Sequence, residues 1–420
     1  MSVDRPMKVC IVYPYATWFM GRPCGGAEKQ VGLLAQHLAR RGNEVTFVAL
    51  HCRAQEDEYD GVRVRCPWDA GEGSPWLRSA TQKLTSLKRL IAEVDADLYY
   101  VRGAQVVSRW VIAGAHALDA PALLGLASDR NLLPESGRAL VPRGRGLVGQ
   151  LTGVAAWSLL QRPALRLADA VIAQNAEQAS RCTRMGLSHA LIPSIVEPPS
   201  RELLECEPDC DVVWAGNVQK AASRSKGVGR LLALVRSLPE VRFAVAGALQ
   251  NLSVSTIVAE LEESSNVELF GPLDYAGTQA LIARSRLVLN TSPAEGFSNV
   301  MLEGWALGKP SVTLDVNPSG LLADGRWPSP ELRGHKGALG VCAGGDIREL
   351  SRLILEALGD EAVLRGVGRR CRTYVAEVHD PDVVCARYED LAAAPRFTPH
   401  RGLPTHGTVQ ALHRESGAPE

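Results

Sequence analysis

The sequence has no excess of either charge, because 46 Lys and Arg residues are balanced by 46 Asp and Glu residues. A dedicated nucleic-acid-binding protein would carry a basic excess, so no nucleic-acid partner is expected. No apolar run reaches the ~18 to 20 residues that a membrane-spanning helix needs. The best candidate, residues 147–160, is interrupted by Gln150 and Thr152. Residues 1–8 are polar and lack the apolar segment of a secretory signal. We therefore expect a cytoplasmic protein with reduced thiols.

Patterns that bind metal are also scarce. The ten cysteines are spread over the whole chain, and Cys206 and Cys210 have no second pair that would complete a zinc site. Two Asp-x-Asp pairs, at residues 95–97 and 209–211, each directly precede a predicted strand, where Asp is common in turns. We expect no metal and no other cofactor.

The chain alternates between strand-like and helix-like patterns, which is typical of parallel α/β sheets. Its 420 residues, 46% of them apolar, are enough for two domains of ordinary size. Strands are predicted at residues 8–12, 44–49, 62–65, 98–101, 122–126 and 170–173, and again at 211–215, 242–246, 267–270, 287–289 and 311–314. Helices are predicted at residues 26–41, 77–94, 106–118, 228–238, 254–263, 275–283, 299–307, 350–357 and 382–392.

A break in this alternation marks a domain boundary. Residues 192–201 are rich in proline, and an acidic stretch that contains cysteine follows. The sequence predicts an α/β protein of two doubly wound, Rossmann-like domains that face each other across a cleft. The predicted parts are a first domain (1–198), a linker (199–210), a second domain (211–378), a last helix (379–395) and a disordered tail (396–420).

The most informative segment is residues 291–310. An apolar run leads into it like a strand, a turn with glycine follows, and Ser298 is placed to cap a helix. Glu295 precedes the cap and Glu303 follows it, so the two carboxylates are separated by roughly 7 to 8 Å along the helix axis. The backbone N–H groups of the helix start point between them and offer an anion site. This spacing fits a capped αβ unit with solvent-facing carboxylates, and it equally fits a site for a diphosphate with hydroxyls at both ends.

The whole segment, with its Ser-x-x-Glu-Gly-Phe entry and Gly-x-Pro exit, closely resembles the Glu–seven residues–Glu motif of family 4 retaining glycosyltransferases. The resemblance implies the GT-B fold, in which the last helix crosses back to the first domain, and a site for a nucleoside-diphosphate sugar. It implies that Glu295 holds hydroxyls of the sugar and that Glu303 holds those of the ribose. The donor-binding residues between them are then Gly296, Phe297, Ser298, Asn299 and Val300.

A glycine loop after the first predicted strand also resembles this family. Gly25 and Gly26 open a predicted helix, and two glycines there allow the backbone to approach a diphosphate closely. The alternative is that they only ease a turn. Because the loop follows a strand in an open α/β pattern, we favour contact with the donor.

Lys226, at the start of the helix predicted at 228–238, resembles the phosphate-binding lysine of the family. A lysine there can neutralise charge that gathers on a leaving diphosphate, although most lysines simply lie in solvated loops. The chain departs from the family pattern at Asn217, where many members carry arginine after a glycine turn. Either Arg224 or Lys220 is a candidate for the missing second cation.

The acceptor-side residues also depart from the family pattern. Residues 97–102, 127–129, 172–178 and 192–196 resemble a bacterial polysaccharide-assembly branch of the family, but the histidine that many relatives carry is replaced near Ser128 and Asp129. Asp129 either takes a polar, catalytic role towards the acceptor or starts a turn. Arg102 follows a strand end and either binds a phosphate of the acceptor or pairs with a carboxylate.

The predicted function is retaining transfer of a sugar from a nucleoside-diphosphate sugar to a hydroxyl of a glycan, a glycolipid or a small molecule, in polysaccharide or glycoconjugate biosynthesis. The resemblance implies front-face attack, with no hydrolase-type pair of carboxylates. The alternatives are a nucleotide-sugar epimerase or phosphorylase of the same fold, or a non-catalytic protein that binds nucleotide-sugars.

One predicted helix has the amphipathic pattern of a segment that either contacts a membrane surface or packs on a sheet. The helix predicted at 77–94 carries Leu84, Leu87 and Ile91 on one side and basic residues elsewhere, and residues 138–145 add arginines. Such a helix can dock on anionic lipid, as a peripheral protein on the inner face of the membrane would, or it can pack on a sheet. We favour packing on a sheet.

Overall fold

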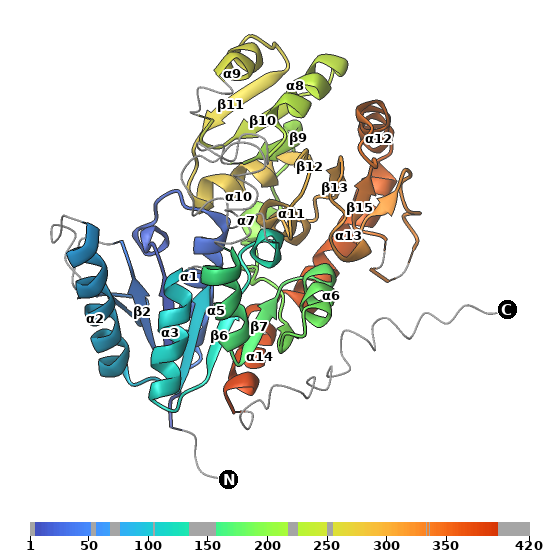
Figure 1. Cartoon of the computed structure of the whole chain (residues 1–420). Coiled ribbons are helices and arrows are strands. Elements are labelled where there is room, and N and C mark those ends of the chain that lie inside the picture. The colour runs from blue at the N-terminus through green and yellow to red at the C-terminus, as the bar shows by residue number, and fades with distance from the viewer. Residues whose placement is uncertain are drawn as a thin grey trace. The chain divides into compact units, whose positions relative to one another are not determined.

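The structure is a computed structural model that describes residues 5–51, 56–67, 76–103, 106–133, 157–216, 226–249, 255–332, 334–335 and 337–393. The chain divides into two compact units. The first unit comprises Met1–Ala16, Leu33–Ile192 and Cys385–Glu420, and the second comprises Thr17–Gly32 and Pro193–Val384. Each unit is built on one sheet, so the predicted α/β architecture of two Rossmann-like units is confirmed (Figure 1).

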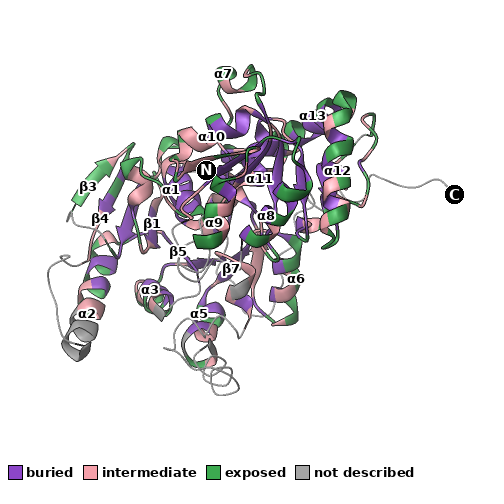
Figure 2. Ribbon diagram, turned by 90° about the horizontal axis from the view of Figure 1, so that it is seen from above, coloured by how far each residue is buried: buried purple, intermediate pink, exposed green. Residues whose placement is uncertain are grey.

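The first unit contains an eight-stranded sheet in which every strand is parallel to its neighbours except the edge strand β3. In spatial order the strands are β3 (Glu56–Tyr59), β4 (Val62–Arg65), β2 (Glu44–Ala49), β1 (Lys8–Tyr13), β5 (Leu98–Arg102), β6 (Ala122–Gly125), β7 (Ala170–Ala173) and β8 (His189–Leu191). The central strands are continuous apolar runs because both of their faces are buried. The charged edge strand β3 is largely exposed, as its green colour in Figure 2 shows.

Helices of the first unit complete its core. They are α2 (Trp76–Val94), α3 (Val106–Ala117), α5 (Arg162–Leu167) and α6 (Ala176–Arg184), with the short turns η2 (Asp129–Leu132) and η4 (Trp157–Gln161). Helices α1 (Gly26–Arg40) and α14 (Pro381–Ala393) are divided between the two units. On α2, Leu87 and Ile91 are buried in the core, so the helix packs on protein at these two positions, as we favoured.

The second unit contains a seven-stranded sheet in which all paired strands are parallel. In spatial order they are β11 (Val267–Gly271), β10 (Phe243–Ala246), β9 (Cys210–Ala215), β12 (Ser285–Asn290), β13 (Ser311–Thr313), β15 (Gly340–Cys342) and β14 (Ala323–Asp324). The sheet first grows from β9 towards β11 and then, from β12 onwards, in the opposite direction. The two central strands β9 and β12 are therefore the point at which the strand order reverses.

The helical segments of the second unit are η1 (Thr17–Met20), α7 (Arg201–Leu204), α8 (Val228–Ser237), α9 (Ser255–Glu262), α10 (Tyr275–Ala283), α11 (Asn299–Ala306), η5 (Pro318–Gly320), α12 (Ile347–Gly359) and α13 (Glu361–Val378). Helix α13 packs closely because it carries glycine at its contacts. A Cβ atom on Gly368 would lie 2.3 Å from the carbonyl oxygen of Gly308, and one on Gly366 would lie 2.7 Å from Pro330 Cα. Only glycine allows this approach.

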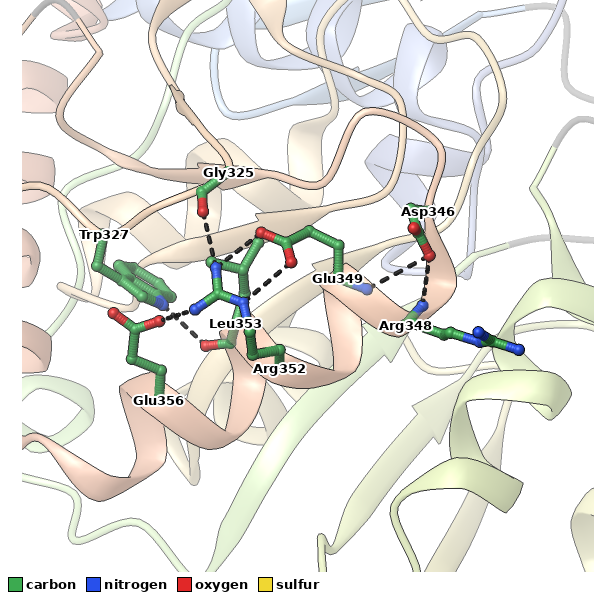
Figure 3. Close-up of polar contacts among 8 residues, drawn as sticks. All are labelled: Gly325, Trp327, Asp346, Arg348, Glu349, Arg352, Leu353 and Glu356. Atoms are coloured by element: carbon green, nitrogen blue, oxygen red, sulfur yellow. Dashed lines mark hydrogen bonds and ion pairs between the residues drawn. The ribbon is translucent and has the colours of Figure 1, made fainter.

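Helix α12 is bonded to the segment that follows β14 (Figure 3). Asp346 caps the helix start, and Arg352 forms ion pairs with Glu349 at 2.7 Å and Glu356 at 2.6 Å. The Arg352 guanidinium also donates to the carbonyl oxygen of Gly325 at 2.8 Å. Exposed ion pairs contribute little stability, so the main effect of Arg352 is to hold the strand segment at β14 against the helix.

Every strand and helix predicted from the sequence is present, with ends that differ by a few residues. Among the described residues, the strands and α-helices that the sequence did not predict are the short strands β3, β8, β14 and β15 and the helices α5, α6, α7 and α13. Helix α7 lies inside the predicted linker. The predicted tail from residue 396 onwards lies outside the described residues, as does the arginine-rich segment at 138–145.

Candidate functional site

The predicted donor residues gather at the reversal of strand order in the second sheet. In open α/β sheets, ligands bind at the carboxyl ends of the strands at this point. Strand β9 is followed along the chain by Lys226 and α8, and β12 is followed by Glu295 and α11. Because β9 and β12 are paired neighbours, both segments leave the same edge of the sheet side by side.

An ion pair joins these two segments. The Lys226 Nζ donates to Glu295 Oε1 at 2.6 Å, and the two side chains are 28% and 20% exposed. Glu295 Oε2 accepts further hydrogen bonds from Asn290 Nδ2 at 3.1 Å and Ser292 Oγ at 3.2 Å. The carboxylate is thus held in a fixed orientation at a position that solvent and a ligand can still reach.

The backbone around Lys226 is fixed as tightly as its side chain. Thr291 Oγ1 donates to the carbonyl oxygen of Lys226 at 2.9 Å and accepts from Trp214 Nε1 at 3.0 Å. Gly227 has a φ of +69°, and a Cβ atom there would lie 2.0 Å from the carbonyl oxygen of Thr291. Position 227 therefore requires glycine, and this glycine places Lys226 against the end of β12.

Helix α11 begins at the same edge. Ser298 occupies the predicted cap position with φ −75° and ψ 121°, but its hydroxyl makes no capping hydrogen bond. The bond from the N–H of Leu302 to the carbonyl oxygen of Ser298, at 3.1 Å, leaves the N–H groups of the first turn without intrahelical acceptors. They form the kind of donor set that binds anions.

Glu303 is less open than its predicted role suggested. It is 4% exposed and forms an ion pair with Lys29, which is itself 7% exposed. The Lys29 ammonium also lies 4.5 Å from the centroid of the Tyr275 ring. Burial and the nearby Glu303 raise the pKa of Tyr275, so this phenol stays neutral. A carboxylate has about four lone-pair positions, so the pairing with Lys29 orients Glu303 and still leaves it able to accept hydroxyls.

The glycine loop meets the start of α11 within the second unit. A Cβ atom on Gly26 would lie 2.3 Å from Asn299 Nδ2, whereas one on Gly25 would meet nothing within 4 Å. Gln30 Nε2 donates to Asn299 Oδ1 at 3.1 Å, and the Gln30 amide also exchanges hydrogen bonds with the backbone of Ile195 at 2.8 and 2.9 Å. Two helix starts, those of α1 and α11, are thereby held next to each other.

Two predicted donor residues have side chains that face protein. Phe297 packs edge-on against Trp305 and His379, with centroid distances of 5.9 and 5.6 Å. Val300 packs against the apolar core of the second unit. We therefore expect these residues, together with Gly296, to reach a ligand only through their backbone.

The predicted acceptor residues belong to the first unit. Asp129 opens η2 and accepts a hydrogen bond from Gln178 Nε2 at 2.8 Å. Arg102 ends β5 and is 6% exposed. Within the described residues, no hydrogen bond or ion pair joins Arg102 to Asp129. Asn217, Lys220 and Arg224 lie outside the described residues.

One aspartate of each Asp-x-Asp pair contacts a neighbouring protein group. Asp97 accepts from the N–H of Lys8 at 2.9 Å, and Asp209 pairs with Arg284, which lowers the pKa of Asp209. In the part of the chain that the structure describes, no group of three His, Cys, Asp or Glu side chains comes together. The helices described also include none that is long and apolar enough to cross a membrane.

The most important residue that the sequence did not indicate is Lys29. Its partner Glu303 is 274 positions away, so no local pattern connects them. The sequence feature that could have indicated Lys29 is its position in the first turn of a helix that opens with two glycines, where a lysine would reach an anion. Asn290, the last residue of β12, was missed because it precedes the motif and no local pattern links its amide to Glu295. Ser292 belongs to the Ser-x-x-Glu entry of the motif, but its hydrogen bond to Glu295 was not predicted.

The arrangement of these groups indicates the class of enzyme to which the chain belongs. The chain has two Rossmann-like units, and the second carries a lysine, a fixed glutamate and two helix starts. These are the parts that a transferase needs to handle an anionic leaving group.

Comparisons with known proteins agree with this class. Residues 25–193 match the family described as glycosyl transferase 4-like domain, and residues 209–360 match glycosyl transferases group 1. Together the two matches span most of the chain. It therefore belongs to the family 4-like glycosyltransferases with the GT-B fold, and it is a transferase. No curated protein sequence matches it.

Solved structures of similar fold cover nearly the whole chain. Sucrose-phosphate synthase from Thermosynechococcus elongatus has a TM-score of 0.67 at 16% identity, over 91% of this chain and 97% of that one. Anabaena HepE, solved with UDP and glucose, has a TM-score of 0.65 at 17% identity, over 92% and 100%. WaaG, a glycosyltransferase involved in lipopolysaccharide biosynthesis, has a TM-score of 0.61 at 15% identity, over 92% and 100%. Identities this low establish the shared fold alone.

Proposed function

We propose that the chain transfers a sugar from a nucleoside-diphosphate sugar to a hydroxyl group and retains the configuration at the anomeric carbon. The observation that carries the proposal is the Lys226–Glu295 pair, which lies at the end of β12, directly before the first turn of α11. A cation, a fixed carboxylate and backbone donors are the groups that a sugar diphosphate needs. The solved complex of Anabaena HepE with UDP-glucose supports this class of donor.

Each part of the donor has a partner in the second unit. Lys226 and the first-turn N–H groups of α11 hold the diphosphate, and Gly25 and Gly26 allow the backbone to approach it. Glu295 accepts hydrogen bonds from hydroxyls of the sugar. Glu303, oriented by Lys29, accepts them from the ribose.

The reaction then needs no separate base. The bond between the anomeric carbon and the diphosphate oxygen breaks, and the acceptor oxygen bonds to the same face of that carbon. The acceptor proton passes to the departing phosphate oxygen, so the products are the glycoside and a protonated nucleoside diphosphate. Lys226 and the helix start stabilise the negative charge that develops on the diphosphate, and no metal takes part.

The acceptor in this proposal is a glycan, a glycolipid or a small molecule, and the setting is polysaccharide or glycoconjugate biosynthesis at the cytoplasmic side. The resemblance of several first-unit segments to a polysaccharide-assembly branch supports this setting, as does the similarity to WaaG. We do not propose that α2 docks on a membrane, because its Leu87 and Ile91 side chains are buried in the protein core.

A ligand panel followed by product analysis tests the proposal. We expect one nucleoside diphosphate to stabilise the full chain against heat, by about 2.7 kcal/mol at a concentration of 100 times its Kd. The corresponding sugar nucleotide should yield a glycoside whose proton NMR spectrum shows the anomeric configuration of the donor. A product of inverted configuration would contradict retention, and conversion of the donor without any acceptor would indicate an epimerase.

A further inference from the structure

A second charged site lies at the reversal of strand order in the first sheet. This sheet grows from β1 through β2 and β4, and then in the opposite direction from β5 through β6, β7 and β8. Arg102 is the last residue of β5, and because Val12 pairs with Val101, it sits at the carboxyl edge beside the end of β1. This is the position at which open α/β sheets bind ligands.

The Arg102 guanidinium is buried, and no carboxylate among the described residues pairs with it. The residue is 6% exposed, and its Nε is fully buried with no hydrogen-bond partner among the described residues. Its Nη1 donates to the Tyr100 hydroxyl at 3.4 Å, a long contact. Arg102 forms no ion pair with any carboxylate in the part of the chain that the structure describes. Buried charges in proteins are normally paired, because an isolated one is costly to remove from water.

The described neighbours of Arg102 on β5, β6 and α14 carry no charge that would neutralise it. Tyr100 packs edge-on against Tyr388 with a centroid distance of 5.4 Å, and burial raises the pKa of Tyr388 well above its usual value, so this phenol is uncharged. The residue of β6 that pairs with Arg102 is Gly125, which has no side chain that could carry a charge. A Cβ atom there would lie 2.0 Å from the Tyr100 hydroxyl. Asp129, the acid that follows β6, is bonded to Gln178 instead.

We propose that Arg102 binds an oxyanion, a phosphate or a carboxylate, that the acceptor carries. The planar guanidinium, with Nε available, can bind such a group through two parallel hydrogen bonds. That the anion belongs to the acceptor rests on the proposed function, whereas the anion site itself does not. The inference resolves the two roles that the sequence left open for Arg102 in favour of a ligand.

The first test measures binding of inorganic phosphate to the full chain by titration calorimetry. We expect Arg102→Gln to weaken phosphate binding at one site about 10- to 100-fold, because a charge-assisted pair of hydrogen bonds is lost. Arg109→Gln is the matched control. Arg109 lies exposed on the neighbouring helix α3, and its substitution removes the same charge. Lys226→Ala should leave the Arg102-dependent site intact. Phosphate binding that is the same in Arg102→Gln and wild type would overturn the proposal.

A stability measurement separates a ligand site from a structural arginine. An unpaired buried charge opposes folding, so Arg102→Met should leave the melting temperature without phosphate unchanged or raise it, and should abolish the increase that phosphate causes. A large fall in melting temperature, with the phosphate response intact, would instead show that Arg102 is structural.

Competition then identifies the source of the anion. Glucose 6-phosphate, glucuronate and phosphatidylglycerol vesicles are each tested for displacement of phosphate, and displacement by any of them that Arg102→Gln abolishes supports the proposal. Displacement by none of them would contradict it. Binding of the nucleoside diphosphate should be the same in Arg102→Gln and wild type. If no nucleoside diphosphate binds while phosphate binding still depends on Arg102, the proposed function fails and the anion site stands.

Discussion

Replacing Lys226 by alanine should separate catalysis from stability. The ammonium lies 2.6 Å from Glu295 Oε1, but both side chains are partly exposed, so the ion pair contributes about 1 kcal/mol or less to folding. Glu295 keeps its hydrogen bonds to Asn290 and Ser292 in the variant. We therefore expect a folded protein whose melting temperature changes by only a few degrees.

The effect on turnover should be much larger. If Lys226 stabilises the departing diphosphate by about 1.5 to 4 kcal/mol in the transition state, its loss lowers kcat by roughly 10- to 1000-fold. The assay follows release of the nucleoside diphosphate with saturating donor and acceptor, so that a change in donor affinity does not hide the change in kcat. Part of the loss should also appear as a higher KM for the donor.

A control near the far end of α8, the helix that follows Lys226, provides a matched comparison. Arg236→Ala removes a basic residue of α8 that pairs with Glu260, away from the site, and should leave kcat within about twofold of wild type. The reasoning is refuted if Lys226→Ala has a kcat close to that of wild type, or if Arg236→Ala loses as much activity.

Three further changes are expected to have distinct effects. Lys29→Met should lower the free energy of unfolding by about 3 to 5 kcal/mol in urea titrations, because it leaves Glu303 buried and unpaired, and adding Glu303→Leu should recover much of this loss. Gly227→Ala should cost more than the about 1–2 kcal/mol of a left-handed backbone, since its Cβ would overlap Thr291, and the displaced Lys226 should lower kcat. Burial raises the pKa of Cys24 to about 12, so iodoacetamide at pH 8 should alkylate this thiol about 100-fold more slowly in native than in urea-unfolded protein, as mass spectrometry would measure.

Each of these expectations has an outcome that would contradict it. A double variant that is no more stable than Lys29→Met would show that the pair is not the source of the loss. Wild-type stability in Gly227→Ala would mean that the turn adopts another conformation. Equal alkylation rates for native and unfolded Cys24 would show that the thiol is open to solvent in the folded protein.

The sequence predicted the order of strands and helices well because most of them carry strong local patterns. The central strands are apolar runs, and the helices that cover them have one apolar side. Helix α13 was missed because Gly366 and Gly368 weaken its helical pattern. Their reason is tertiary: they allow the close approach of Pro330 and Gly308, which lie far away in the sequence.

The candidate site was predictable where it depends on one continuous segment. Glu295, Glu303 and the helix start lie within a single motif that follows β12. Lys226 follows β9, the strand that pairs with β12. Contacts between distant segments were not predictable, above all the burial of Glu303 by Lys29. The absence of a side-chain cap at Ser298 was also hidden, since the residue type permits a cap but does not enforce one.

A crystal structure of the full chain with a bound nucleoside diphosphate would decide whether the second unit holds the donor. We predict that the diphosphate lies within hydrogen-bond distance of Lys226 Nζ and of the first-turn N–H groups of α11, with the ribose hydroxyls on Glu303. A nucleotide bound elsewhere, with the pair between Lys226 and Glu295 unchanged and the start of α11 open to water, would contradict the proposed donor site.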